Sequence, residues 1–487
     1  MNQLLLERAT GAVGPNVFAR LQTTQLLRSF QPAPQYRFDG GERGIAVNDG
    51  EASSSDAASS IWAHQAGVSA LALERFDGRI LVSGGSDASI KLWDLEQCSN
   101  PTSPHTHTHT HTHTHTHAFK PVATIRPSAQ THKFGITHLS FYPFDSAAFI
   151  STSYDQTLKL WSTEQARLSA SFSLGSKIYT HAISPVASHL LVACGTQHPA
   201  VRLVDLRSGS SIQSLTGHGG AILATAWSPR HEHVLATGSV DGTVRIWDIR
   251  RAGALIGMLD HEDSLGLYYN GLLEKDGHVK MRASAKAHVA PVNGLTWTDD
   301  GSYIVSAGHD NRIRVWDAAT GKNTLASFGP SIRNAQLASV TMFTSPVGLT
   351  HPGRELLFWP NETEILVCDL HNGHIITKLR GTGAAISGVR SSKKSERSVK
   401  NRISSVVWRG AGGGGGSGGV VMGGTNMPGA IFSAHLDGQI RAWVPQLGGV
   451  DEDDEDSLAE AGEERSKKRK LLNDVYKSFM GQKITFT

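Results

Sequence analysis

The sequence consists of short apolar runs that alternate with polar residues and end at turns. Runs such as IKLWD, VRIWD and IRVWD follow turn segments such as GGSD, SVDG and AGHD. Within one run, the side chains of Val244, Ile246 and Trp247 are expected on both faces of a strand, because successive β residues alternate. Short strands between closely spaced turns predict radially arranged antiparallel sheets of about four strands each.

Five of these runs repeat four residue types at a fixed spacing. An aspartate stands six residues before each tryptophan, and a serine or threonine stands four residues before each aspartate. In four units a histidine stands 22 or 23 residues before the aspartate. The tryptophans are Trp93, Trp161, Trp247, Trp316 and Trp443; the aspartates Asp87, Asp155, Asp241, Asp310 and Asp437; the hydroxyl residues Ser83, Ser151, Thr237, Ser306 and Ser433; the histidines His64, His132, His218 and His288. Such self-similarity predicts a repeat architecture.

Two further units lack the tryptophan and carry Val204 or Cys368 in its place, which makes seven units. The pattern resembles WD repeats over about residues 55–446. The resemblance implies an all-β, seven-bladed WD-repeat β-propeller, in which the aspartate bonds the histidine and the histidine reaches the hydroxyl and then the tryptophan nitrogen. Such a network satisfies buried polar groups that would otherwise cost about 1–3 kcal/mol each.

The recurring Ser, His and Asp also invite a hydrolase interpretation. A catalytic triad, however, is a single constellation with one nucleophile, whereas this trio recurs at the same spacing in several units. We therefore expect a structural network, no enzyme activity, no cofactor and no metal site.

Composition narrows the remaining classes. Apolar residues make up 39% of the 487, with no long uninterrupted apolar stretch, which disfavours both a wholly disordered chain and a membrane protein. Cys98, Cys194 and Cys368 form no CxxC pair, which indicates a reducing compartment and no cysteine-based zinc site. The net charge of +3 is small, so we expect no direct sequence-specific binding of nucleic acid.

The two ends of the chain differ from the repeats. Residues 1–33 predict a helix-turn-helix segment with Pro15 in a first helical turn. This segment has three open interpretations: a transit peptide, padding for the propeller's own base, or docking into a groove on another protein. Residues 447–487 are acidic and then basic, which predicts a disordered tail. Its residues Lys467, Lys468, Arg469 and Lys470 indicate either a nuclear localisation signal or a solvated basic run.

The repeat region, residues 34–446, is longer than seven units require. The excess is predicted as loop insertions at 99–118, 261–284, 388–401 and 410–428. The first insertion contains alternating His and Thr from His105 to His117, which is either a divalent-metal ligand set or a low-complexity expansion. No residues after Trp443 remain to form the last outer strand, so we expect the extended segment near Tyr36 to Phe38 to close the ring.

Two units end in WDIR (Trp247 to Arg250) and VDLR (Val204 to Arg207). The first matches the WDxR motif of propellers that serve as substrate receptors of cullin ubiquitin ligases. Together with ILVSGGSDASIKLWDLE, GHGGAILATAWSPRHEHVLATGSVDGTVRIWDIRRAG, DNRIRVWDAATGKNTL and DGQIRAWVP, the chain resembles the Cockayne syndrome A family, the WD-repeat factors of transcription-coupled nucleotide excision repair.

This resemblance implies a non-catalytic substrate receptor in the nucleus. One face and the N-terminal helices would bind a damage-binding-type propeller adaptor and its cullin ligase. The opposite face would hold a stalled RNA polymerase II complex with its repair ATPase. The residues implied for adaptor binding are Trp247, Asp248, Arg250, Leu5, Phe18 and Leu21. The alternative is a ubiquitin-independent scaffold in a nuclear chromatin or RNA-processing complex.

Overall fold

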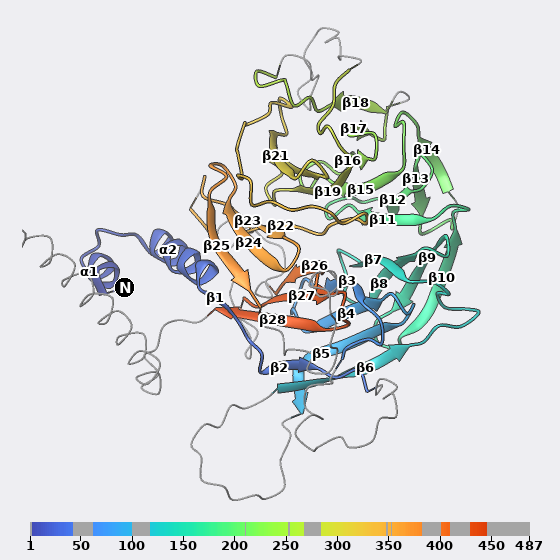
Figure 1. Cartoon of the computed structure of the whole chain (residues 1–487), viewed down its shortest axis with the longest axis horizontal. Coiled ribbons are helices and arrows are strands. Elements are labelled where there is room, and N and C mark those ends of the chain that lie inside the picture. The colour runs from blue at the N-terminus through green and yellow to red at the C-terminus, as the bar shows by residue number, and fades with distance from the viewer. Residues whose placement is uncertain are drawn as a thin grey trace, which may run out of the picture. The chain divides into compact units, whose positions relative to one another are not determined.

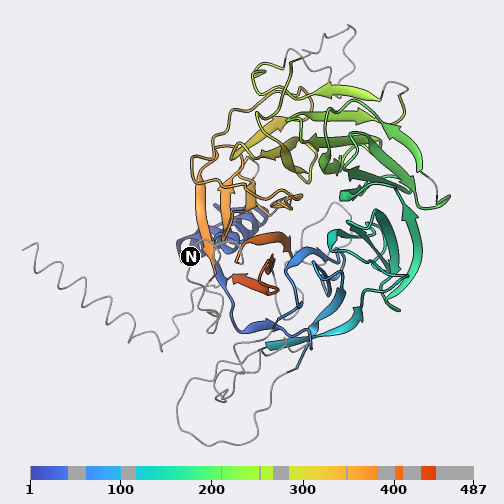
Figure 2. The same ribbon diagram turned by 45° about the vertical axis from the view of Figure 1, so that its right-hand side comes forward.

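The fold is a ring of seven sheets, seen in the computed structural model of the chain (Figure 1 and Figure 2). The structure describes residues 2–41, 62–99, 117–209, 211–251, 254–266, 284–346, 349–351, 353–381, 401–409 and 429–445. The predicted seven-bladed WD-repeat propeller is thereby confirmed. We number the blades 1 to 7 in the order in which the chain enters them.

The first four blades are continuous in sequence. Blade 1 contains β3 (Val68–Leu73), β4 (Ile80–Gly85), β5 (Ile90–Ser99) and β6 (His117–Ile125). Blade 2 contains β7 (Ile136–Phe141), β8 (Ala148–Ser153), β9 (Thr157–Ser162) and β10 (Arg167–Ser173). Blade 3 contains β11 (Ile178–Ile183), β12 (Leu191–Thr196), β13 (Val201–Asp205) and β14 (Ser211–Leu215). Blade 4 contains β15 (Ile222–Trp227), β16 (Val234–Ser239), β17 (Val244–Asp248) and β18 (Leu255–Met258).

The remaining blades are less regular. Blade 5 has three strands in the described residues: β19 (Val292–Trp297), β20 (Tyr303–Gly308) and β21 (Arg312–Asp317). Blade 6 contains β22 (Phe343–Thr344), β23 (Leu356–Pro360), β24 (Glu364–Asp369) and β25 (Ile375–Arg380). Blade 7 contains β26 (Ile403–Trp408), β27 (Ile431–His435) and β28 (Ile440–Pro445), completed by β1 (Phe30–Pro32) from the N-terminus.

Buried side chains fill the space between neighbouring sheets. The five repeat tryptophans are at most 1% exposed, and Val204 and Cys368 are buried equally in the same position of blades 3 and 6. Each strand therefore sends one row of side chains into each seam, as the sequence alternation requires. Burying a large apolar side chain contributes about 1.5–3 kcal/mol, so the seams supply most of the stabilisation between blades.

The ring closes with N-terminal residues, but earlier ones than predicted. Phe30 pairs with Pro445 and Pro32 with Trp443, so β1 and not Tyr36–Phe38 is the last outer strand. Phe30 fixes this register because its buried ring lies 6.2 Å from that of Phe358 in blade 6. The prediction of Tyr36–Phe38 as the closing strand is therefore wrong.

Tyr36–Phe38 forms β2, a fifth strand on blade 1 that runs parallel to β6. Phe38 is 3% exposed and contacts the rings of Trp93 in blade 1 and Phe432 in blade 7. The segment from Phe30 to Phe38 thus crosses the seam between the two blades. We call these residues the closing segment.

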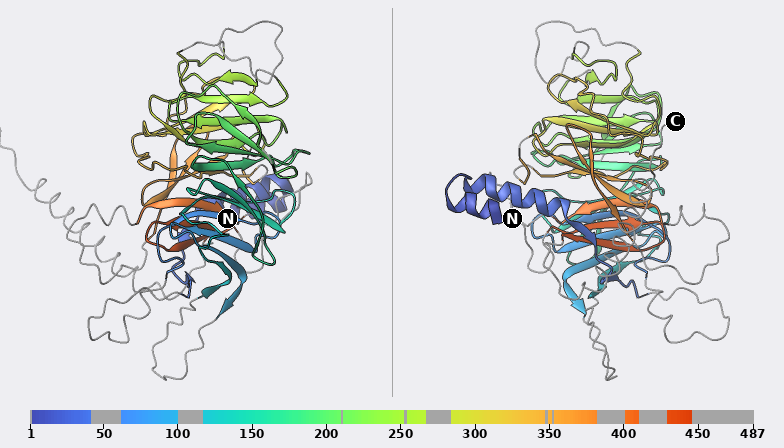
Figure 3. Two further views of the ribbon diagram at one scale, coloured as in Figure 1. Left: turned by 90° about the vertical axis from the view of Figure 1, so that its right-hand side faces the viewer. Right: turned by 60° about the vertical axis from the view of Figure 1, so that its left-hand side comes forward.

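Two helices precede the closing segment: α1 (Asn2–Ala9) and α2 (Pro15–Arg28). The predicted helical extension is confirmed, and Figure 3 shows both helices outside the sheets. The end of α2 packs on the propeller, because Leu27 is 1% exposed and joins the core of blades 6 and 7. The hydroxyl of Thr23 also donates to the carbonyl of Leu349 in blade 6. No helix in the described residues is long and apolar enough to cross a membrane.

Several predictions concern residues that the structure covers only in part. Residues 447–487, with Lys467, Lys468, Arg469 and Lys470, lie outside the described residues, as do most of the four predicted insertions. The 99–118 insertion begins and ends inside strands, because Ser99 of β5 pairs with Ala118 of β6. His117, the last residue of the His-Thr tract, belongs to β6 and its ring stacks on that of Tyr36 at 4.9 Å.

The sheets present two faces to solvent. One face, which we call the Asp248 face, carries the ends of the third strands, such as Asp248, and the loops between first and second strands. The other, the Asp241 face, carries the turns between second and third strands, such as that of Asp241, and the connections between blades. Each loop lies on the same face in every blade, because all first strands of a propeller run in one direction.

Candidate functional site

The repeated Asp, His, hydroxyl and Trp residues meet inside each blade. In blade 2, the two ring nitrogens of His132 lie 2.8 Å from Asp155 Oδ2 and 2.7 Å from Ser151 Oγ. Trp161 Nε1 donates to the same Ser151 oxygen at 2.7 Å. Blade 5 repeats the arrangement, with His288 at 2.9 Å from Asp310 and 2.8 Å from Ser306, and Trp316 Nε1 at 2.9 Å from Ser306.

Blades 1 and 4 insert a hydroxyl between histidine and aspartate. His64 Nδ1 lies 2.8 Å from Ser89 Oγ, which donates to Asp87 at 2.7 Å, and His218 uses Thr243 and Asp241 in the same way. The other ring nitrogens reach Ser83 and Thr237 at 2.7 Å, which also accept from Trp93 and Trp247. A Ser or Thr recurs two residues after the aspartate, at Ser89, Thr157 and Thr243, and the sequence analysis missed this signal.

The electrostatics of these networks are those of a structural element. Burial alone would raise the pKa of Asp155, but hydrogen bonds from His132 and Thr157 lower it to about 2. Burial lowers the pKa of His218 and His288, against the pull of their aspartates. The network hydroxyls of Ser151 and Thr237 are fully buried and already bonded, so no substrate reaches them as nucleophiles.

In blade 7 the network serine bonds a histidine that the sequence analysis missed. Ser433 Oγ accepts from Trp443 Nε1 at 2.9 Å, and its histidine partner, also at 2.9 Å, is His435 from the same strand. Asp437 instead bonds Arg441 Nη2 at 2.7 Å. The missing signal was the histidine in SAHLDG, at the position that glycine or serine holds in the other units.

The WDIR motif forms a fixed ion pair on the Asp248 face. Arg250 Nε donates to Asp248 Oδ1 at 3.0 Å and its Nη2 to Oδ2 at 2.8 Å, while its backbone N–H donates to Oδ1 at 3.1 Å. The carboxylate is 5% exposed, whereas the Arg250 side chain is 64% exposed. The hydrogen bond from Arg250 lowers the pKa of Asp248. A buried anion thus orients an exposed guanidinium, whose donors lie in one plane.

Trp247 does not contact solvent beside this pair. It is 1% exposed, and its nitrogen is used by Thr237. The strand alternation turns the indole into the seam between blades and Asp248 the other way. In this structure the Trp247 side chain therefore does not lie where an adaptor could contact it directly.

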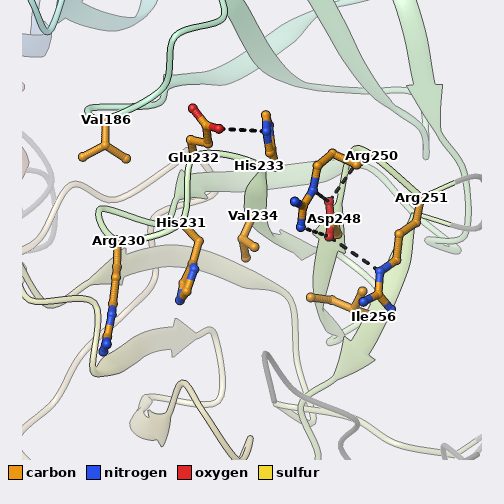
Figure 4. Close-up of a pocket in the computed structure, with 10 residues that line it drawn as sticks. All are labelled: Val186, Arg230, His231, Glu232, His233, Val234, Asp248, Arg250, Arg251 and Ile256. Carbon is orange, nitrogen blue, oxygen red and sulfur yellow. Dashed lines mark hydrogen bonds and ion pairs between the residues drawn. The ribbon is translucent and has the colours of Figure 1, made fainter. Parts of the chain in front are cut away.

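A cavity of about 430 Å³ adjoins Arg250 between blades 3 and 4 (Figure 4). Its wall combines the loop before β16, from Arg230 to His233, with Arg250 and Arg251 from the other side, and Val186 comes from blade 3. Burial, followed by the charges of Arg230 and Arg250, lowers the pKa of His231. The lining thus combines three arginines, Arg230, Arg250 and Arg251, with the carboxylates of Glu232 and Asp248.

The two motif candidates differ once they are folded. In VDLR, Arg207 contributes its backbone N–H to Asp205 at 2.9 Å, and its side chain is exposed. In blade 1 an arginine does pair with the WD aspartate, but it is Arg79 from the preceding loop, at 2.6 Å from Asp94. Among these three, WDIR alone holds its own arginine with both carboxylate oxygens.

The predicted helix anchors lie on the same side as Arg250. Phe30 pairs with Pro445 at the end of β28, so α2 joins the sheets where third strands end, which is the Asp248 face. Phe18 is half-buried in α2 and Leu21 is exposed, and neighbouring Val17 is exposed as well. Leu5 belongs to α1, but its side chain lies outside the described part of the chain. The fold thus gathers the motif and the helices on one face.

Comparison with known proteins identifies the repeats. The model of the WD domain, G-beta repeat, matches residues 57–94, 119–162, 209–248 and 279–317. WD repeat-containing protein ATCSA-1 of Arabidopsis thaliana is 30% identical over 319 residues, covering 54% of this chain and 69% of that protein. Radiation-sensitive protein 28 of Saccharomyces cerevisiae is 29% identical, covering 39% of each chain. Ribosome biogenesis protein ytm1 of Aspergillus niger is 27% identical, covering 52% of this chain and 53% of that protein.

These relatives correct the identification as a Cockayne syndrome A protein. Similarity to ribosome biogenesis proteins recurs at nearly the same identity and over about half of the chain. The segments behind that identification contain the turn and strand residues that build blades, such as Asp241 and Trp247, so they report the fold more than a particular member. The chain belongs to the WD-repeat family of β-propeller proteins.

Proposed function

We propose that this propeller is the substrate-recognition subunit of a cullin-RING ubiquitin ligase in transcription-coupled nucleotide excision repair. The observation that carries the proposal is the exposed Arg250 guanidinium, which buried Asp248 holds with two hydrogen bonds. It lies on the face from which the N-terminal helices leave the propeller. A WD-repeat propeller is a scaffold fold, and we propose a role without catalysis by this chain.

Docking would use a charged contact and an apolar one together. Arg250 would donate to carbonyl or carboxylate oxygens of a damage-binding-type propeller adaptor, with little loss of side-chain entropy because Asp248 already orients it. Phe18 and Leu21 of α2 would enter an apolar groove on the adaptor. The stalled RNA polymerase II complex with its repair ATPase would bind elsewhere on the propeller, and proximity would raise the effective concentration of acceptor lysines.

The name of the yeast relative, radiation-sensitive protein 28, supports the repair part of this proposal. The basic run at Lys467 to Lys470 supports a nuclear location. Partners and location both belong to the proposal and share its tests.

The test is copurification of the adaptor and cullin from nuclear extract after ultraviolet irradiation. Arg250→Ala should lower recovery by about tenfold or more, since a charge-assisted hydrogen bond contributes roughly 1.5–3 kcal/mol. Arg207→Ala is the matched control, because this arginine uses only its backbone N–H in the equivalent turn, and it should bind normally. Equal recovery with Arg250→Ala would exclude this anchoring scheme.

A second pair of variants tests the helix. Leu21→Glu should weaken adaptor recovery, because it places a charge in the apolar contact. Gln25→Glu, an exposed polar position on the same helix, should leave recovery unchanged. Arg207→Ala, Leu21→Glu and Gln25→Glu should melt like the wild type, because the altered side chains are exposed. Arg250→Ala should melt somewhat lower, because it removes two hydrogen bonds from the buried Asp248 carboxylate.

A second candidate function is a scaffold in ribosome biogenesis, favoured by the recurrence of ytm1 relatives. It predicts cosedimentation with preribosomal particles without ultraviolet irradiation, and recovery that does not depend on Arg250. The same Arg250→Ala sample distinguishes the two functions.

A further inference from the structure

A group of exposed aromatic and basic side chains lies on the Asp241 face, opposite the docking face. Phe134 is 61% exposed in the connection between blades 1 and 2, and Tyr154 is 39% exposed in the turn between β8 and β9. Tyr179 of β11 is half-buried, and Lys133 and Lys177 are exposed. We call these five residues the aromatic–lysine patch.

Backbone contacts make this patch continuous. Ser153 Oγ donates to the carbonyl of Phe134 at 2.7 Å, and the backbone N–H of Tyr154 donates to the carbonyl of Gly135 at 3.3 Å. The rings of Tyr154 and Tyr179 meet edge to face, with centroids 6.2 Å apart. Tyr154 and Tyr179 therefore join blade 2 to the innermost strand of blade 3. Lys133 and Phe134 belong to the connection before blade 2, and Lys177 directly precedes β11.

The charge that this patch shows to solvent is positive. Asp155 lies beside it, but its side chain is 8% exposed and bonds both His132 and the backbone N–H of Lys133. The partner must therefore offer negative charge at intervals together with flat apolar groups. Exposed aromatic side chains provide stacking faces, which suit bases of any identity, and lysines provide phosphate contacts.

We infer that the aromatic–lysine patch binds single-stranded nucleic acid without sequence preference, through base stacking on Phe134 and Tyr154 and phosphate contacts from Lys133 and Lys177. Double-stranded DNA fits poorly, because its bases are already stacked on each other. This binding is separate from the proposed adaptor docking, which lies on the other face, and does not depend on it.

The test is fluorescence anisotropy of a labelled thymidine oligonucleotide with the full-length protein. Phe134→Ala and Tyr154→Ala should each weaken binding by roughly 5- to 50-fold, whereas Tyr154→Phe should retain it. Phe144→Ala, an exposed phenylalanine in a loop of the Asp248 face, is the matched control and should bind like the wild type. Lys133→Ala should reduce the slope of log affinity against log salt by about 0.7, as for one lost phosphate contact.

Two probes separate stacking from charge. An oligonucleotide with abasic sites should bind the wild type at least as weakly as the intact one binds Phe134→Ala, because it loses stacking on both rings. Poly-glutamate should bind far more weakly than the thymidine oligonucleotide. Binding that is insensitive to both aromatic variants would overturn the inference, because it would place the contact in basic residues elsewhere. Poly-glutamate binding as tight as that of thymidine would also overturn it, in favour of an acidic peptide partner.

Discussion

Blades 2 and 7 are both four-stranded sheets, but their strands come from different parts of the chain. Blade 2 is one continuous stretch of chain, from Ile136 to Ser173, joined by local turns. Blade 7 takes three strands from the C-terminal part and its outer strand, β1, from Phe30–Pro32. Its outer edge therefore depends on a contact between residues more than 400 positions apart. The comparison teaches that the ring is as stable as its closing segment, while the other sheets form locally.

The largest effect should follow from removing β1 together with the helices that precede it. Deletion of residues 2–34 removes Leu27 and Phe30, both 1% exposed, and leaves β28 as an unpaired edge. Each lost side chain costs roughly 2–5 kcal/mol, so the melting temperature should fall by roughly 10 °C or more. Deletion of residues 2–13, which removes α1 alone, is the control for shortening the chain and should change the melt little. Equal melts for both deletions would show that blade 7 does not need β1.

A second comparison uses the serine at the centre of each network. Ser151→Ala in blade 2 and Ser433→Ala in blade 7 each leave a buried histidine and tryptophan nitrogen without a partner. The cost should be about 2–4 kcal/mol in both cases. In the chain that lacks residues 2–34, Ser433→Ala should cost much less, because blade 7 is already frayed, whereas Ser151→Ala should keep its full effect. If the cost of each serine variant were the same in the full-length chain and in the shortened chain, ring closure and the hydrogen-bond network would be independent.

The sequence predicts the local parts of this comparison better than the distant ones. Hairpins and their buried tryptophans follow from alternation within about 40 residues, and the seven-bladed fold follows from repeating them. The choice of Phe30 over Tyr36 as closing residue does not, because both precede short extended segments with aromatic side chains. The folded chain distinguishes them, because Phe30 is buried beside Phe358 whereas Tyr36 is half-buried. Likewise WDIR and VDLR read alike, and the difference between Arg250 and Arg207 appears only when their aspartates are placed.

Lowering the pH should change the stability contributions of Asp155 in blade 2 and Asp437 in blade 7 in opposite directions. The pKa of Asp155 is held at about 2, below the ordinary 3.8, so its stabilising contribution is present above that value and is lost as pH falls through about 2. Burial raises the pKa of Asp437 despite its pairing with Arg441, so its ionisation costs stability as pH rises above 3.8. The difference in melting temperature between the wild type and Asp155→Asn should therefore become smaller on acidification. The melting temperature of the wild type should instead rise relative to that of Asp437→Asn. A change in the same direction for both variants would contradict the environments assigned to the two aspartates.

The smallest effect concerns the part of the closing segment that blade 2 lacks, the fifth strand on blade 1. Tyr36 is half-buried, and its ring stacks on those of His117 at 4.9 Å and Phe119 at 6.2 Å. Tyr36→Ala should cost about 1 kcal/mol, the usual contribution of such ring pairs, and lower the melting temperature by roughly 1–3 °C. Tyr36→Phe keeps the ring stacking and should lose less stability than Tyr36→Ala. A loss as large as that of the 2–34 deletion would mean that β2, rather than β1, carries ring closure, because the deletion leaves Tyr36 in place.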